Sequence, residues 1–133
     1  MKIKIISAEK TKDKNLLALE EEYLKRCRGW KVEITQKQET KGQKQFWVVL
    51  DERGENPKTL DLAKKLEKVA ASGKEIAFLI GAADGHDAQM IEKADYLLSF
   101  GKLTWAHKLV RMMLCEQIYR IWSVLNGHPY HRE

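Results

Sequence analysis

Short apolar segments alternate with amphipathic segments along this chain. Five segments have the composition of β-strands: Lys2–Ala8, Val32–Thr35, Phe46–Leu50, Ile76–Ile80 and Leu97–Phe100. The third and fourth are apolar almost throughout, which is typical of strands buried on both faces of a sheet. Three segments between the strands predict helices: Asn15–Arg28, Pro57–Ala71 and a shorter one from Asp87 to Lys93. Strands that alternate with helices predict a single α/β domain over residues 1–133, with a mostly parallel sheet flanked by helices.

The last part of the chain predicts one long helix. Its apolar residues recur at helical spacing: Leu109, Val110, Met113, Leu114, Ile118, Ile121, Trp122 and Leu125. Asn126 and Gly127 follow, and both residue types tolerate the left-handed conformation that ends helices. Met112 and Tyr119 widen the apolar stripe. The helix therefore either packs into the core alone, which the stripe by itself favours, or also forms a dimer surface.

The composition is that of a soluble globular domain. Of 133 residues, 44% are hydrophobic and 32% are charged, and no apolar run approaches the length of a membrane span. The chain begins with the alternating pattern of a strand and lacks the apolar segment of a secretory signal, so we expect a cytoplasmic protein. Cys27 and Cys115 lie far apart and match no metal-binding spacing, which favours two reduced thiols. His128 and His131 have no further ligand at metal-binding spacing, and we expect no metal.

The positive charge is concentrated in the N-terminal third of the chain. The net charge is +5, and residues 1–46 hold 12 Lys and Arg against 7 Asp and Glu, whereas residues 47–133 hold 12 of each. This distribution suits a polyanionic partner such as RNA, and a lysine-rich solvated face explains it equally well.

Two glycine-containing loops follow predicted buried strands. Gly81–Gly85 follows the fourth strand, and Gly101–Ala106 joins the fifth strand to the long helix. Ligands of open α/β sheets bind beyond the carboxyl ends of the strands, and the free amides of a helix N-terminus attract acceptor groups. Neither loop has the spacing of a dinucleotide fingerprint or of a P-loop, and the sequence has no readable Ser-His-Asp arrangement. The loops therefore predict a ligand site of another kind at this edge of the sheet.

Five motifs resemble those of one enzyme family. They are Leu50-Asp-Glu-Arg-Gly54, Phe78-Leu-Ile-Gly-Ala-Ala-Asp-Gly85, Leu98-Ser-Phe-Gly-Lys-Leu-Thr-Trp-Ala-His107, Glu116-Gln-Ile-Tyr-Arg120 and His128-Pro-Tyr-His-Arg132. In this order they are similar to the motifs of the ribosomal large-subunit methyltransferase H family, which are SPOUT-class enzymes. The resemblance implies a SPOUT-type fold with a C-terminal trefoil knot, a homodimer, and S-adenosyl-L-methionine as cofactor. It also implies methylation of N3 of a pseudouridine in 23S rRNA on the ribosome.

The resemblance also implies which residues form the site. Those expected around the cofactor are Leu50, Gly81, Ala82, Gly101, Lys102, Leu103, Thr104, Trp105 and Ala106. Those expected at the chemistry are Arg120, Tyr130, His131 and Arg132. The N3–H of the base must lose its proton, and His131 is the first candidate for the general base. Arg120 and Arg132 are expected to steady the developing negative charge or to hold phosphate. Glu116, four residues before Arg120, also predicts a surface ion pair between the two.

The chain departs from the family pattern at three places. Ala82 stands where the family has glycine, Gly101 and Ala106 alter the second loop motif and remove its proline, and the polar loop Gln36–Gln45 replaces a longer segment that includes a helix. A methyl group at position 82 crowds a cofactor held by backbone contacts, and the lost proline removes a fixed φ. A competing hypothesis is therefore a non-catalytic SPOUT-like RNA-binding dimer with a degenerate cofactor pocket. A third, a nucleotide- or phosphate-binding enzyme of another kind, rests on the strand-end glycines alone.

The length of the last helix sets a geometric condition on the role of the C-terminal tail. The helix spans roughly 28 Å at 1.5 Å per residue, so its end lies far from the loop that precedes it. If the tail takes part in the chemistry, it either folds back along its own helix or, as we expect, reaches the site of a partner subunit across an antiparallel helix pair. Cofactor binding and chemistry are then carried by different parts of the chain.

Overall fold

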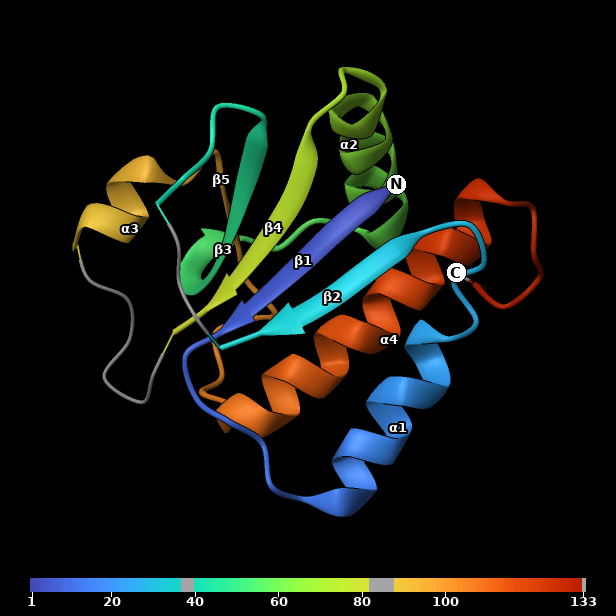
Figure 1. Ribbon diagram of the computed structural model, residues 1–133, viewed down its shortest axis with the longest axis horizontal. Helices are drawn as coiled ribbons and strands as arrows, with labels where there is room; N and C mark the ends of the chain where they lie inside the picture. Colours follow the sequence, from blue (N-terminus) through green and yellow to red (C-terminus); the bar gives the residue numbers. More distant parts are fainter. Residues whose placement is uncertain (37–39, 82–87, 133) are drawn as a thin grey trace.

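The computed structural model describes residues 1–36, 40–81 and 88–132 (Figure 1). Within these ranges five strands form one sheet in the order β2-β1-β4-β3-β5, and every pairing is parallel. The strands are β1 (Lys2–Ser7), β2 (Lys31–Thr35), β3 (Gln45–Glu55), β4 (Glu75–Ile80) and β5 (Tyr96–Leu98). The predicted α/β class with a parallel sheet is confirmed, and the trefoil knot implied by the resemblance stays a prediction.

Four helices are described, and three of them cover the same face of the sheet (Figure 1). The helices are α1 (Lys14–Leu24), α2 (Thr59–Ala71), α3 (Ala88–Lys93) and α4 (His107–Leu125). Helix α4 packs beside both α1 and α2 over this face. The short helix α3 lies on the other face, where Met90 packs against a cluster that includes Trp47 and Val49.

The central strands are apolar throughout because both of their faces are buried. In β4, Ile76, Phe78 and Ile80 face the layer of α1, α2 and α4, while Ala77 and Leu79 face the layer of α3. None of these five side chains is more than 5% exposed. Burial of a side chain as large as Phe78 contributes about 1.5–3 kcal/mol, so a polar residue in this strand would be costly on either face.

Helix α1 ends earlier than predicted, at Leu24 instead of Arg28. Beyond it, the backbone N–H groups of Arg26 and Cys27 donate to carbonyls three residues back, at 3.2 and 3.1 Å. This tighter 3₁₀-type geometry ends the α-helical hydrogen-bond ladder before the apolar periodicity ends. Gly29, with a φ of 84°, then turns the chain toward β2.

Strand β3 continues beyond its predicted end at Leu50. The sequence predicts a turn at Asp51–Gly54, but β3 runs on to Glu55. Leu50 and Glu55 both pair with Leu98, so the residues between them form a bulge. A Cβ on Gly54 would lie 2.6 Å from backbone atoms of β5, which explains why glycine occupies this position. The prediction was wrong because the partner that draws Glu55 back into the sheet is a strand far along the chain.

Two predicted segments lie partly outside the described residues. Within the loop Gln36–Gln45, residues 37–39 are not described; the rest holds no helix, and Gln45 begins β3. The short helix predicted from Asp87 is described from Ala88 onward.

Candidate active site

The carboxyl ends of three neighbouring strands meet at one edge of the sheet. Strands β4, β3 and β5 are adjacent and parallel. Gly81 directly follows β4, Ser99 directly follows β5, and Leu50 lies on β3 between them, so the three residues are close together. Leu50, on the central strand of the three, pairs with Leu98 and is 9% exposed. Parallel sheets bind ligands at this edge. Ala82, which follows Gly81, lies outside the described residues.

The loop after β5 begins with a tight turn. The Ser99 hydroxyl donates to the Gly101 carbonyl at 2.8 Å, and the Gly101 N–H donates to Ser99 Oγ at 3.0 Å. The Ser99 N–H donates to the Glu55 carbonyl at 2.7 Å, which ties the turn to the bulged end of β3. Gly101 has a φ of 110°, a conformation that strains any residue with a Cβ. This turn ends β5 at Leu98, two positions before the predicted end at Phe100.

The rest of the predicted cofactor loop lies on the surface. Lys102, Thr104 and Ala106 are exposed, and the large apolar side chains of Leu103 and Trp105 are 72% and 40% exposed. Ala106 is the N-cap of α4, and no side chain caps this helix end. The loop therefore presents backbone groups and apolar surface beside the carboxyl edge of the sheet.

A second group of predicted residues gathers around Glu116 of α4. Arg120 Nε donates to Glu116 Oε1 at 2.8 Å, and the Tyr130 hydroxyl donates to the same oxygen at 3.2 Å. Arg120 Nη1 lies 3.2 Å from His131 Nδ1, and the guanidinium carbon lies 4.8 Å from the centre of the Tyr130 ring. Three of the four residues predicted for chemistry are therefore in contact, and the ion pair predicted from spacing is present as well. Arg132, the fourth residue, is exposed.

Burial and the ion pair set the protonation of this cluster. Burial raises the pKa of Tyr130 to about 12, and hydrogen bonding and charge from Tyr23 and Glu116 act in the same direction. Burial by itself lowers the pKa of Arg120, but the hydrogen bond and negative charge of Glu116 outweigh it, and the pKa is raised. At neutral pH the phenol therefore keeps its proton and the guanidinium keeps its charge.

A cavity of about 320 Å³ lies between the turn after β5 and this cluster. Its lining comes from the start of α2, the end of β5 and the middle of α4: Asn56, Pro57, Thr59, Leu62, Leu98, Ser99, Phe100, Met113, Glu116 and Gln117. The Thr59 hydroxyl donates to Gln117 Oε1, and Gln117 Nε2 donates to Glu116 Oε2, both at 3.0 Å. Glu116 therefore belongs to the cavity wall and to the tail cluster at once.

Sequence reasoning missed the residues of this cavity, since none of the predicted site residues lines it. Two signals were available. Ser99 and Phe100 directly follow a buried strand, and Glu116 stands four residues before Arg120. No signal connected Thr59 with the site, because its partner Gln117 lies 58 positions away in the chain.

The tail folds back along its own α4. The His128 N–H donates to the Ser123 carbonyl at 2.9 Å, and the rings of Tyr119 and Tyr130 are 4.7 Å apart between centres. The Tyr130 hydroxyl thereby reaches Glu116 in the middle of the helix. Of the two arrangements that the length of the helix allows, this is the first, and not the reach into a partner subunit that we expected, because Tyr130 packs on Tyr119 and bonds to Glu116 of its own chain.

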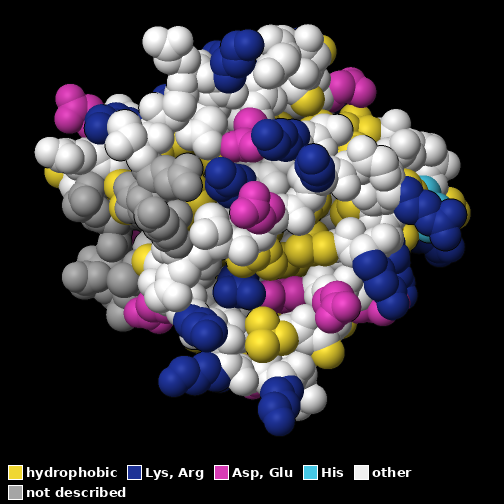
Figure 2. All heavy atoms as spheres, in the orientation of Figure 1, with side chains coloured by type: hydrophobic (Ala, Val, Ile, Leu, Met, Phe, Trp, Pro, Cys, Tyr) yellow, Lys and Arg dark blue, Asp and Glu magenta, His cyan; other side chains and the backbone are white. Residues whose placement is uncertain are grey.

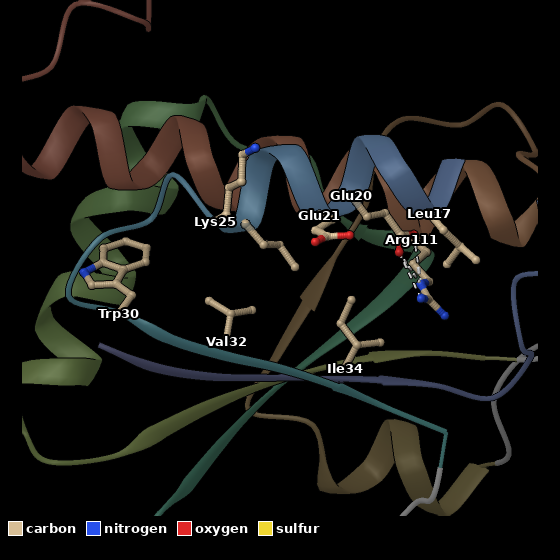
Figure 3. A pocket seen from close by; sticks show the side chains of 9 residues that line it. Leu17, Glu20, Glu21, Lys25, Trp30, Val32, Ile34 and Arg111 are labelled. Atoms are coloured by element: carbon tan, nitrogen blue, oxygen red, sulfur yellow. Dashed lines mark hydrogen bonds and ion pairs between the residues drawn. The ribbon is translucent and has the colours of Figure 1, made fainter. Parts of the chain in front are cut away.

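A larger cavity of about 500 Å³ lies between α1 and the edge strand β2 (Figure 3). Figure 3 shows Glu20 and Arg111 turned toward each other in it, with Val32 and Ile34 of β2 opposite α1. Arg111 donates to both carboxylate oxygens of Glu20 at 2.9 to 3.1 Å. A band of hydrophobic side chains crosses this side of the molecule between charged side chains (Figure 2). The cavity shares no residue with the predicted site.

The part of the chain that the structure describes has neither a metal-binding cluster nor a membrane-spanning helix. There, no three His, Cys, Asp or Glu side chains group in a way that could hold a metal ion. Cys27 and Cys115 are free thiols, as expected, and both are buried. No described helix combines the length and the apolarity needed to cross a bilayer.

Comparison with known proteins assigns the chain to a family. Residues 1–131 match the family described as predicted SPOUT methyltransferase, and the chain belongs to this family. Several relatives carry the name ribosomal RNA large subunit methyltransferase H, so the resemblance seen in the motifs is confirmed. The relative from Rhizorhabdus wittichii is 44% identical over 122 residues, which are 86% of this chain and 86% of that protein.

Other relatives of the same name match over a smaller share of their length. The protein from Erythrobacter litoralis is 47% identical over 110 residues, which are 77% of this chain and 79% of that protein. The protein from Mesorhizobium japonicum is 50% identical over 86 residues, which are 64% of this chain. That match spans little more than half of the relative, 54% of its length.

Proposed function

We propose that this chain is an S-adenosyl-L-methionine-dependent methyltransferase that acts on N3 of a pseudouridine in 23S rRNA, on the cytoplasmic ribosome. The family and the names of the relatives support an RNA methyltransferase. In the chain itself, one observation carries the proposal. The turn after β5, at Ser99 and Phe100, lines a cavity whose opposite wall leads through Glu116 to Arg120 and His131.

The described residues suit a nucleoside cofactor at the carboxyl edge. Leu50 offers apolar surface on the central strand of the three, and Gly81 and Gly101 have no side chain to keep a ligand from the backbone. When bound, S-adenosyl-L-methionine supplies a methyl group activated by its attachment to a sulfonium. The task of the protein is then to hold the acceptor base in line with that group and to exclude water.

The cluster around Glu116 suits the other half of the reaction. An N3 imide that has lost its proton carries negative charge on the nitrogen and on the two flanking carbonyl oxygens. Arg120, whose side chain is 26% exposed, is charged and held in place by Glu116. A preorganised cation in a partly buried site stabilises such an anion better than water does. Tyr130 and Arg132 stand on the tail beside His131 and are proposed to assist in holding the substrate.

We further propose that the chain works as a homodimer through α4 and the loop before it. Leu103, Trp105 and Leu109 are 72%, 40% and 39% exposed. Met112 and Met113 on the same helix are half-buried. Large apolar side chains that stay exposed in one segment of the chain favour an association site there. Sedimentation should therefore give twice the chain mass of 15.5 kDa, and a stable folded monomer at micromolar concentration would contradict the dimer.

Calorimetric titration with S-adenosyl-L-methionine tests the cofactor site. The wild-type chain should bind, and Gly81→Val should not, because an isopropyl group at the end of β4 fills the ligand edge. Gly42→Val is the matched control: it makes the same change before the amino end of β3, where a Cβ meets only the Gln45 side chain at 3.6 Å. It should leave the affinity unchanged.

Cofactor titration, ribosome binding and methyl transfer together separate the proposed methyltransferase from a non-catalytic RNA-binding protein. A folded wild-type dimer that binds ribosomes but not the cofactor would support the non-catalytic RNA-binding hypothesis. Equal affinity of wild type and Gly81→Val would place the cofactor elsewhere. Cofactor binding without transfer of a labelled methyl group to unmodified ribosomes would refute the proposed substrate.

A further inference from the structure

The contact between Arg120 and His131 determines which ring nitrogen of the histidine carries a proton. Arg120 Nη1 lies 3.2 Å from His131 Nδ1. A guanidinium has only N–H donors and no lone pair that could accept a hydrogen bond. Nδ1 must therefore be the acceptor, and the single N–H of the neutral ring is at Nε2. In this arrangement the free nitrogen of His131 is a donor and has no lone pair to offer to a proton.

His131 Nε2 is buried and has no hydrogen-bond partner among the described residues. The other buried side-chain atom of this kind, His107 Nδ1, lies 3.5 Å from a carboxylate oxygen of Glu9, so it has an ionic neighbour. Nearly all buried polar groups in folded proteins are paired, and an unpaired one costs about 1–3 kcal/mol. A buried, unpaired donor beside a guanidinium therefore points to an oxygen acceptor with negative charge as its missing partner.

We infer that His131 donates its Nε2–H to a carbonyl oxygen of the deprotonated acceptor base and does not remove its proton. This inference rests on the proposed function. In the ionisation step the N3–H bond breaks, the proton passes to a hydroxide ion of the solvent to form water, and the electron pair stays on the imide. One of the two flanking oxygens, which share the negative charge, accepts the hydrogen bond from His131.

This role differs from the general base expected from the sequence. For Nε2 to take a proton from the base, the ring proton would have to sit on Nδ1. The N–H of Nδ1 and the N–H of Arg120 would then face each other at 3.2 Å, with no acceptor between them. The geometry at Arg120 thus favours a donor at position 131.

His128 provides an internal reference for this assignment. The backbone N–H of Tyr130 donates to His128 Nδ1 at 3.3 Å, so the proton of this ring is also expected at Nε2. Unlike His131, His128 is exposed. The two tail histidines therefore share one tautomer, because in each ring Nδ1 faces an N–H donor, and of the two only His131 offers its Nε2 donor inside the protein.

Nitrogen-15 NMR of histidine-labelled protein tests the tautomer directly, and it does not depend on activity. The His131 signals are assigned by their loss in His131→Gln. At a pH where the enzyme is assayed, His131 should show a protonated Nε2 and an unprotonated Nδ1. A ring protonated at Nδ1, alone or together with Nε2, would overturn the inference whether or not the protein methylates RNA.

Kinetics of two variants test the role in the reaction. Glutamine places its amide nitrogen close to the position of Nε2, where it donates a hydrogen bond but takes no proton. His131→Gln should keep kcat within about tenfold of wild type, whereas His131→Ala should lose about 10²–10³-fold, as for the removal of one anion-stabilising donor. His128→Gln is the matched control and should stay near wild type.

Equal losses in His131→Gln and His131→Ala, with folding and cofactor affinity preserved in both, would show that the ring serves as a proton acceptor. That result would refute the inference while leaving the proposed function intact. A wild-type chain without methyl transfer would refute the proposed function and this role together, and only the NMR result on the tautomer would remain.

Discussion

Gly54→Ala should destabilise the bulge of β3, and the size of the effect can be worked out from the backbone contacts. An ideal Cβ at position 54 lies 2.6 Å from the carbonyl carbon and oxygen of Leu97 and 2.8 Å from the Leu98 nitrogen. Ordinary van der Waals contact begins at 3.4 Å, so one of the two backbones must move by the difference, about 0.8 Å. Gly54 does not have a positive φ, so the cost is steric and not conformational.

The atoms that block the new methyl group belong to a strand backbone and cannot swing aside as a side chain does. Overpacking typically costs about 1–3 kcal/mol, and we expect about 3 kcal/mol here, which lowers the melting temperature by roughly 10 °C in a domain of this size. The displaced β5 is followed directly by Ser99, whose N–H donates to the Glu55 carbonyl at 2.7 Å, so cofactor affinity should fall as well.

Thermal and urea unfolding followed by circular dichroism measure the first effect, and calorimetric titration measures the second. Gly42→Ala is the control, because its Cβ would lie 3.6 Å from the Gln45 side chain and its φ is not positive. It should be neutral or stabilise by about 0.5 kcal/mol through the unfolded state. Neutral surface substitutions change the free energy of unfolding by roughly ±0.5 kcal/mol. A Gly54→Ala protein whose free energy of unfolding stays within about 1 kcal/mol of wild type would therefore show that β3 and β5 do not approach this closely.

Two further predictions concern buried groups outside the site. Arg111→Met leaves the Glu20 carboxylate, whose side chain is 3% exposed, without its partner. The free energy of unfolding, measured with urea, should fall by about 3–5 kcal/mol. Adding Glu20→Leu should recover most of this loss. Stability should also fall as the pH rises from about 9 toward 12, because burial raises the pKa of Cys27 from 9.0 and that of Tyr96 from 10.0, each to about 12. Both groups then stay neutral in the folded chain while they ionise in the unfolded one. Urea unfolding across this range should show a weaker decline in Cys27→Ala, and an equal decline would exclude the thiol as a cause.

The layered fold could be predicted from the sequence because a strand buried on both faces is apolar at almost every position. Ile76–Ile80 is apolar at every position, and the structure buries every one of them. The strand order could not be predicted, because a buried pattern shows how many faces a strand covers and not which strand lies beside it. The bulge at Gly54 has the same explanation: it depends on contact with Leu97, a residue far along the chain.

The site shows a similar limit. The motifs and their resemblance pointed to the loop at Gly101, to Arg120 of α4 and to His131 of the tail. Their neighbours Phe100 and Glu116 line one cavity from opposite sides. The cavity wall was missed because it forms only where α2, β5 and α4 meet. Thr59 and Gln117 are bonded at 3.0 Å although 58 positions separate them, and no local pattern carries such a contact.

The ion pair between Glu116 and Arg120 connects the two interpretations that the sequence offered for Arg120. Four-residue spacing on a helix predicted a structural pair, and the motif resemblance predicted a role in chemistry. In the structure Arg120 directs both Nε and Nη2 at Glu116 Oε1, at 2.8 and 2.7 Å. Because the guanidinium is planar and rigid, this fixes its orientation and leaves Nη1 to face His131. The ion pair with Glu116 thus fixes the orientation of the Arg120 guanidinium, and the guanidinium in turn fixes the tautomer of His131.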